Sequence, residues 1–169
     1  RNVDRDFNEG FTRINSDYFG VNPVYDAATF ARRLRMPHSA FNRIYTALSD
    51  RPEFLRTADA LGVLRLYPLQ KIVAAIRMLG YRTAADACDE YIRISESSAS
   101  GALRLFCETV CKEFGGEYGR QPKAEDLRRI LAINAMRGFP GCLGSIDSQH
   151  WKWERFPVAF AGQFTGKEK

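Results

Sequence analysis

The fold of this chain is decided by residues 67–98, which read YPLQKIVAAIRMLGYRTAADACDEYIRISESS. The apolar residues in the first half of this stretch repeat at helical spacing, so we predict a helix that ends at Gly80: Ile72, Val73, Ile76 and Leu79. A short helix follows through about Tyr91. Ser95 or Ser97 then begins a longer helix with an apolar face that reaches Phe114.

A helix, a short helix and a long helix in this order are typical of a helix-turn-helix DNA reader, whose last helix enters the major groove. On that interpretation the start of the long helix contacts bases, and basic residues upstream contact phosphates. The candidate DNA-binding residues are Lys71, Arg82, Ser97, Ser98, Ser100 and Arg104. A plain three-helix bundle has the same periodicity, so the pattern leaves both interpretations open.

The composition indicates a folded protein. The chain has 169 residues, of which 45% are hydrophobic and 27% charged, enough to build one domain, or a small domain and part of another. Charged residues interrupt every apolar run before it reaches the length of a membrane helix, so we expect no membrane contact. The first residue is Arg1 with no apolar signal sequence after it, so we expect the chain to begin inside a longer reading frame.

The positive charge is concentrated in one block. The chain carries a net charge of +5, but between Ala27 and Arg82 nine Arg and one Lys face only three acidic residues, a local balance of +7. A basic block with Tyr and Phe between the charges suits a polyanion such as DNA, because each phosphate contact releases counterions. A solvated helix face has the same composition, so charge alone does not decide between them.

The flanking segments have weaker signals. We interpret residues 1–25 as an irregular lead-in and place a helical domain at residues 26–137, in which Asp26 caps a helix that ends at Met36, before Pro37. A second helix is expected over 37–48 and a loop over 49–67. A final helix is expected over 123–137, ended by Gly138 and Pro140, and the domain boundary is expected near Arg137.

Beyond that boundary the pattern changes. Residues 142–146, CLGSI, are short, apolar and interrupted by Gly, which predicts a buried strand with Asp147 at its end. A carboxylate fixed by a strand is suited to Mg²⁺ or Mn²⁺ chemistry, although a lone Asp in this position is also a common turn residue. His150 and Lys152 follow closely as near-site candidates, although a lone histidine is more often a hydrogen-bonded structural residue.

The four cysteines do not have the spacing of a zinc site. They form no C-x-x-C pair, and only two histidines are available to complete a ligand set. We therefore expect them to be small buried hydrophobic residues in a reducing compartment. The terminal segment GQFTGK, residues 162–167, is too short for a Walker phosphate loop, because it lacks the four-residue gap before Gly-Lys-Ser/Thr.

Several motifs together resemble one family. The segment RGFPGCLGSIDSQHWKW at residues 137–153, followed by GQFTGK at 162–167, closely resembles the PIF/Harbinger transposases in the plant-transposon-protein branch. Upstream, FARRLRM at 30–36, the stretch 67–98 and Asp-Tyr-Phe at 17–19 are also similar to that family. The resemblance therefore extends from about residue 17 to the C-terminal end.

The resemblance implies a metal-dependent DNA endonuclease with an RNase H-like core. Asp147 matches the first of three metal-binding carboxylates, Asp, Asp and Glu, which bind Mg²⁺ or Mn²⁺ in that family. The upstream helices match the helix-turn-helix region proposed to recognise transposon ends in double-stranded DNA. The resemblance further implies a nuclear protein that often acts with a separate Myb-like partner.

The sequence also departs from the family pattern. Ser148-Gln149 replaces the usual Cys-Met, and only Glu154 and Glu168 follow Asp147 as acidic residues, neither of which matches the second Asp or the Glu. We therefore expect an N-terminal fragment that is catalytically inactive. Its expected fold is mainly α, a helix-turn-helix-like domain followed by the first strand of a truncated RNase H-like α/β nuclease core at residues 138–169. The alternatives are a non-catalytic DNA-binding module and a helical protein-interaction domain.

Overall fold

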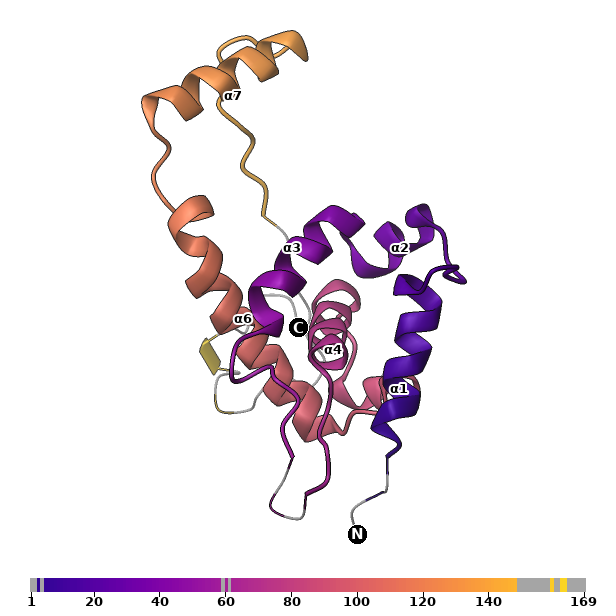
Figure 1. Cartoon of the computed structure of the whole chain (residues 1–169). Helices are drawn as coiled ribbons and strands as arrows, with labels where there is room; N and C mark the ends of the chain where they lie inside the picture. The colour runs from indigo at the N-terminus through magenta and orange to yellow at the C-terminus, as the bar shows by residue number, and fades with distance from the viewer. Residues whose placement is uncertain are drawn as a thin grey trace. The chain divides into compact units, whose positions relative to one another are not determined.

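The chain folds mainly into helices, as predicted (Figure 1). The computed structural model describes residues 3, 5–58, 60, 62–148, 159 and 162–163. Within these residues there is no strand, and a single isolated β-bridge joins Ala58 to Leu64. No helix among them is both long enough and apolar enough to span a bilayer. The elements are α1 (Phe7–Ile14), the π-helix η1 (Asn15–Phe19), α2 (Ala27–Leu34), α3 (His38–Ser49), α4 (Pro68–Tyr81), the 3-10 helix η2 (Ala85–Cys88), α5 (Asp89–Ile92), α6 (Glu96–Tyr118) and α7 (Ala124–Met136).

The contacts within the chain divide it into two units between Glu113 and Phe114, inside α6. The domain boundary expected near Arg137 stays a prediction. Burial explains where the contacts thin out, because the last buried residue of α6 is Phe106 and α7 has no buried residue. The predicted apolar side of α7 is accordingly only partly buried, and Ile133 is 37% exposed.

Helix α4 forms the centre of the first unit. It contacts α1, α2, α3 and η2, and eight of its fourteen residues are buried. Ile72 and Val73 are completely buried, and burial of an aliphatic side chain of this size stabilises a fold by about 1.5–3 kcal/mol. The helix predicted from these residues is confirmed, and its surroundings hold it from several sides.

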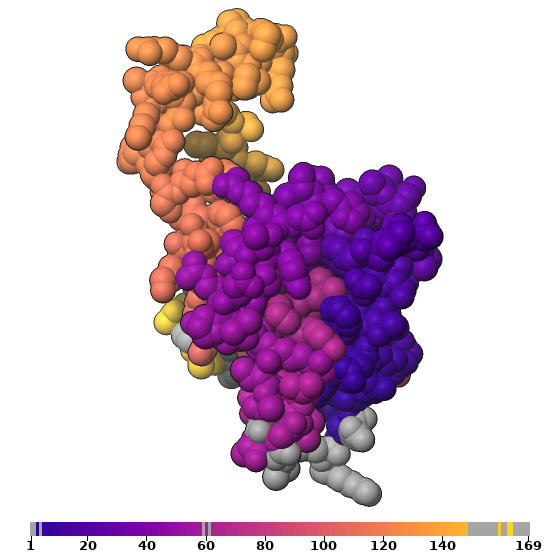
Figure 2. Space-filling model, viewed as in Figure 1, coloured from indigo at the N-terminus to yellow at the C-terminus, as the bar shows by residue number. Residues whose placement is uncertain are grey.

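The N-terminal residues are helical, which corrects the expectation of an irregular lead-in. Helix α1 is capped by Asp6, whose side chain accepts a hydrogen bond from the Glu9 amide at 2.9 Å. Ile14 and Tyr18 are 0% and 1% exposed, and Figure 2 shows the N-terminal segment in indigo as part of the face of this unit. The sequence did carry a helical signal, because apolar residues recur there at intervals of four, three and four: Phe7, Phe11, Ile14 and Tyr18.

Gly10 obscured that signal, and the structure explains why glycine is there. A Cβ atom at this position would lie 2.2 Å from the backbone oxygen of Ile92 and 2.7 Å from Nε2 of Gln70. Gln70 is completely buried and links two elements, since its Nε2 donates to the Ile92 oxygen and its Oε1 accepts from the Tyr67 amide. The glycine thus permits close packing of α1 against the end of α5.

Three helices end on an arginine in the left-handed conformation. Arg35, Arg82 and Arg93 follow α2, α4 and α5 with φ of 59°, 57° and 59°. This backbone conformation costs a non-glycine residue about 1–2 kcal/mol, whereas a cation beside a helix C-terminus regains about 0.3–1 kcal/mol. Gly80, predicted as the end of α4, instead lies inside the helix, where an added Cβ would be 2.8 Å from Cγ of Arg35.

Substitution of Gly10 tests the packing of α1. Gly10→Ala should lower the free energy of unfolding by about 3 kcal/mol, because the new methyl group meets a backbone oxygen that cannot rotate away. Gly101→Ala is the matched control, since Gly101 lies in α6 with nothing within 4 Å, and we expect it to raise stability by about 0.5–1 kcal/mol. Urea unfolding followed by circular dichroism measures both; equal stability of Gly10→Ala and the wild type contradicts the close approach.

Candidate nucleic-acid interface

Helices α4, α5 and α6 occur in the order that the sequence predicted. The turn before α6 is fixed by Ile92 and Ile94, both completely buried. Ser95 then begins α6, because its Oγ accepts a hydrogen bond from the Ser98 amide at 3.3 Å. The direction in which α6 leaves the core is therefore set by two buried side chains and a serine cap.

The predicted base-contacting residues lie on the surface of α6. Ser97, Ser98, Ser100 and Arg104 are all exposed, and the side chain of Arg104 is 84% exposed. Ser97, Ser100 and Arg104 are three and four residues apart, so they share one helix face. Glu108 lies one turn further along, with its Oε1 3.5 Å from Nε of Arg104. The structure thus places Ser97, Ser100 and Arg104 on one accessible face, and Ser98 is exposed beside it.

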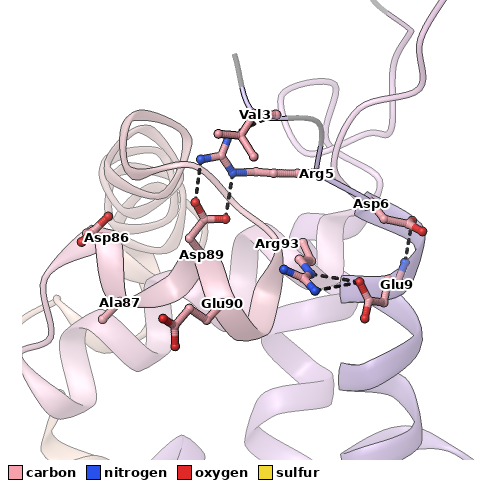
Figure 3. Close-up of a pocket in the computed structure, with 9 residues that line it drawn as sticks. All are labelled: Val3, Arg5, Asp6, Glu9, Asp86, Ala87, Asp89, Glu90 and Arg93. Atoms are coloured by element: carbon pink, nitrogen blue, oxygen red, sulfur yellow. Dashed lines mark hydrogen bonds and ion pairs between the residues drawn. The ribbon is translucent and has the colours of Figure 1, made fainter. Parts of the chain in front are cut away.

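Figure 3 shows an acidic hollow formed by α1, η2, α5 and the residues beside them. The hollow is lined by five carboxylates and two arginines: Asp6, Glu9, Asp86, Asp89 and Glu90, with Arg5 and Arg93. Arg5 donates from Nε and Nη2 to Asp89, at 2.8 and 2.6 Å, and these hydrogen bonds lower the pKa of that carboxyl. A neighbouring hollow continues past Glu96 to Ser97 and Ser98. The carboxylates disfavour phosphate at this end of the face, because like charges repel.

Lys71 has a structural role in the fold, and its phosphate contact stays a prediction. Its Nζ donates hydrogen bonds to the backbone oxygens of Glu53, Phe54 and Leu55 at 3.1, 3.1 and 3.4 Å. The ammonium group is half-buried, and this desolvation, with repulsion from Arg65, lowers its pKa. All three donors of the ammonium group are therefore directed at the turn after α3.

Arg82 lies at the surface beside Tyr81, whose own neighbours the sequence did not indicate. It is exposed at the end of α4, directly after Tyr81. The guanidinium carbon of Arg35 lies 4.8 Å from the centre of the Tyr81 ring, and the Tyr81 hydroxyl lies 3.5 Å from the backbone oxygen of Arg32. Only the density of arginine in the sequence hinted at this grouping, because it depends on the packing of α2 against α4.

The strand predicted before Asp147 is wrong for the described residues. Residues 142–148 have no regular structure, Asp147 is exposed, and Ile146 is 103% exposed. An isolated strand leaves its backbone groups unpaired, and no described segment pairs with this one. The end of α7 follows the prediction better, since Gly138 and Gly141 have φ of 87° and 79° and turn the chain.

The described residues do not fit a magnesium or manganese site. No group of three His, Cys, Asp or Glu side chains among them is placed to hold a metal ion. Asp147 therefore stays a predicted ligand, and the near-site candidates His150 and Lys152 lie outside the described residues. Of the cysteines, Cys88 is buried as expected, but Cys111 is exposed. Burial of the Cys88 thiol raises its pKa.

Comparison with known proteins supports the predicted family for the C-terminal part. Residues 116–169 match a family described as plant transposon protein, which confirms the resemblance there. Residues 10–49, from α1 to α3, match a domain of unknown function (DUF8418). No curated protein and no solved structure matches the chain.

Lys71→Met tests the structural role of this lysine. The variant keeps the length of the side chain but leaves three carbonyl oxygens without their donor, so we expect the free energy of unfolding to fall by about 1–3 kcal/mol. Lys112→Met is the control of equal charge, because Lys112 is exposed on α6, and it should unfold like the wild type. Thermal unfolding distinguishes them; equal melting temperatures for the two variants would show that the Lys71 contacts contribute nothing.

Proposed function

We propose that the first unit, built on α1 to α6, is a DNA-binding module of a transposase-type protein, with double-stranded DNA as its ligand. The observation that carries the proposal is the match of residues 116–169 to plant transposon proteins, directly after a helix, short helix and long helix. A transposon protein of this kind must hold DNA, and a helix-turn-helix is a common means of doing so. We further propose that the protein acts in the nucleus.

The exposed face of α6 supports direct base contacts. Arg forms bidentate hydrogen bonds with guanine, and serine hydroxyls donate to or accept from any base. Arg104 is therefore the residue on which sequence discrimination would depend most, with Ser97 and Ser100 on the same face. The acidic residues beside the start of α6 mean that most of the attraction to phosphate must come from elsewhere on the molecule.

The endonuclease activity of the resembled family rests on the resemblance alone. Asp147 is our proposed ligand for Mg²⁺ or Mn²⁺ in that chemistry, but the described residues assemble no site around it. We therefore assign no catalytic step to these residues. A Myb-like partner protein is proposed on the same basis as the endonuclease activity.

A helical protein-interaction domain is the second candidate function. The observation that favours it is the acidic hollow of Figure 3, which is complementary to a basic segment of another protein. The two functions differ in their ligand, so a DNA-binding measurement separates them.

Salt dependence of DNA binding tests the proposal. The full chain should bind a duplex of about 20–30 base pairs, with an affinity that falls steeply as salt is raised, because phosphate contacts release counterions. Asp147→Ala should bind like the wild type, since Asp147 lies outside the first unit. Fluorescence anisotropy measures both constants. A wild-type chain that shows no salt-sensitive binding would reject the DNA-binding function and favour protein interaction.

Arg104→Ala tests the α6 face separately. Loss of a bidentate base contact costs about 1–3 kcal/mol, so the variant should bind its preferred sequence more weakly and discriminate less between sequences. Arg13→Ala removes the same charge from α1, where Arg13 contacts Glu9 and the backbone oxygen of Glu90, and it should discriminate like the wild type. Binding constants for a panel of duplexes show the difference; unchanged discrimination in Arg104→Ala would reject this reading face.

A further inference from the structure

The C-terminal ends of α2 and α4 meet around Tyr81. We define the Tyr81 cluster as Arg32, Arg35, Tyr81 and Arg82. The guanidinium carbon of Arg35 is 4.8 Å from the Tyr81 ring centre, and the Tyr81 hydroxyl is 3.5 Å from the backbone oxygen of Arg32. All four side chains are exposed, and Tyr81 is 40% exposed. The cluster therefore gathers three exposed positive charges where the ends of α2 and α4 meet.

The backbone at the cluster would favour glycine in place of two of these arginines. Arg35 and Arg82 both have positive φ at a helix end, where glycine is the usual residue because it lacks a Cβ. Strained conformations of this kind are concentrated at functional positions. The presence of arginine at both sites points to a role for the side chains.

Arg93 has the same conformation, and its guanidinium is paired with a carboxylate. Its Nε donates to Glu9 at 3.0 Å beside the acidic hollow. Arg35 instead lies over the ring of Tyr81, a cation–π contact that uses the flat face of the guanidinium and not its N–H donors. The N–H edge of a guanidinium matches two phosphate oxygens, which is why arginine is favoured at phosphate sites.

The cluster and the acidic hollow are formed by different elements. Residues from α1, η2 and α5, with those just before α1, line the hollow, and α2 and α4 contribute none. The positive charge is therefore gathered on a surface of its own. Duplex DNA carries a dense row of phosphates, so its charge is complementary to this surface.

We infer that the Tyr81 cluster binds the phosphate backbone of duplex DNA and supplies much of the sequence-independent affinity. This inference rests on the proposed function and identifies where the phosphates bind. Arg32, Arg35 and Arg82 pair with phosphate oxygens. These contacts position the protein on the duplex and carry no sequence information.

Replacement by glycine separates binding from folding. Glycine fits the positive φ at both sites, so the double variant Arg35→Gly/Arg82→Gly should melt no lower than about the wild-type temperature. Each lost phosphate contact should reduce the slope of log affinity against log salt by about one unit, about two for the double variant. We expect its affinity for a mixed-sequence duplex in 100 mM salt to fall roughly tenfold or more.

The matched control removes the same charge from two arginines that contact Glu9 of the acidic hollow. Arg13→Ala/Arg93→Gly takes away two arginines, one of them in the same left-handed conformation, and both contact Glu9. It should keep the wild-type slope. Fluorescence anisotropy at four salt concentrations gives the slopes, and thermal unfolding confirms that each variant is folded.

Each outcome decides the inference. A reduced slope in the Tyr81 cluster variant alone supports it. A wild-type slope in that variant, or an equal reduction in the control, overturns the inference but leaves DNA binding intact. No binding by the wild type rejects the proposed function, and the inference with it.

Discussion

The contact between α1 and the end of α5 is the constraint on which the first unit depends. At Gly10 the backbone of α1 comes so close to the Ile92 oxygen and to Gln70 that no side chain fits between them. The buried amide of Gln70 fixes the same point from α4, because it bonds to both the Ile92 oxygen and the Tyr67 amide. Displacing the Gln70 amide or the Ile92 oxygen is costly, because each would lose its described hydrogen-bond partner inside an apolar core. Three elements are thereby locked together where α5 ends.

That lock also sets the geometry of the candidate interface. The residues from Ile92 to Ser95 run directly from the locked end of α5 into α6, and both isoleucines in between are buried. The contact between α1 and α5 therefore determines the direction in which the exposed face with Ser97, Ser100 and Arg104 points. A surface that recognises a rigid partner such as duplex DNA needs support of this kind, because disorder in the first turn of the helix would have to be frozen on binding.

The sequence predicted the helices well where apolar periodicity was strong, and poorly where a residue owed its identity to a distant contact. Helix α4 was predicted from its buried aliphatic residues, but the roles of Gly10 and Gly80 depend on Ile92 and Arg35, which are far away in sequence. The charge pattern likewise did not predict the roles of individual residues. The basic block was evident, yet Lys71 is used to hold a turn, and Arg56 donates to the Arg65 oxygen and to Asn8. Composition counts charges, whereas only packing decides which of them face a ligand.

The segment around Asp147 also shows that the role of a residue depends on packing and not on sequence pattern alone. Leu143 and Ile146 are 57% and 103% exposed, although their sequence has the apolar character of a buried strand. Burial of these side chains and positioning of Asp147 require the same event, because a strand is stable only beside partners that pair its backbone and cover its apolar face. Strand formation would hold the Asp147 carboxylate at the edge of a sheet, where other ligands can meet it. Without it, Asp147 is an exposed carboxylate on an irregular segment, and a single such group binds Mg²⁺ weakly. Asp147 can therefore act as a metal ligand only if the predicted strand before it forms.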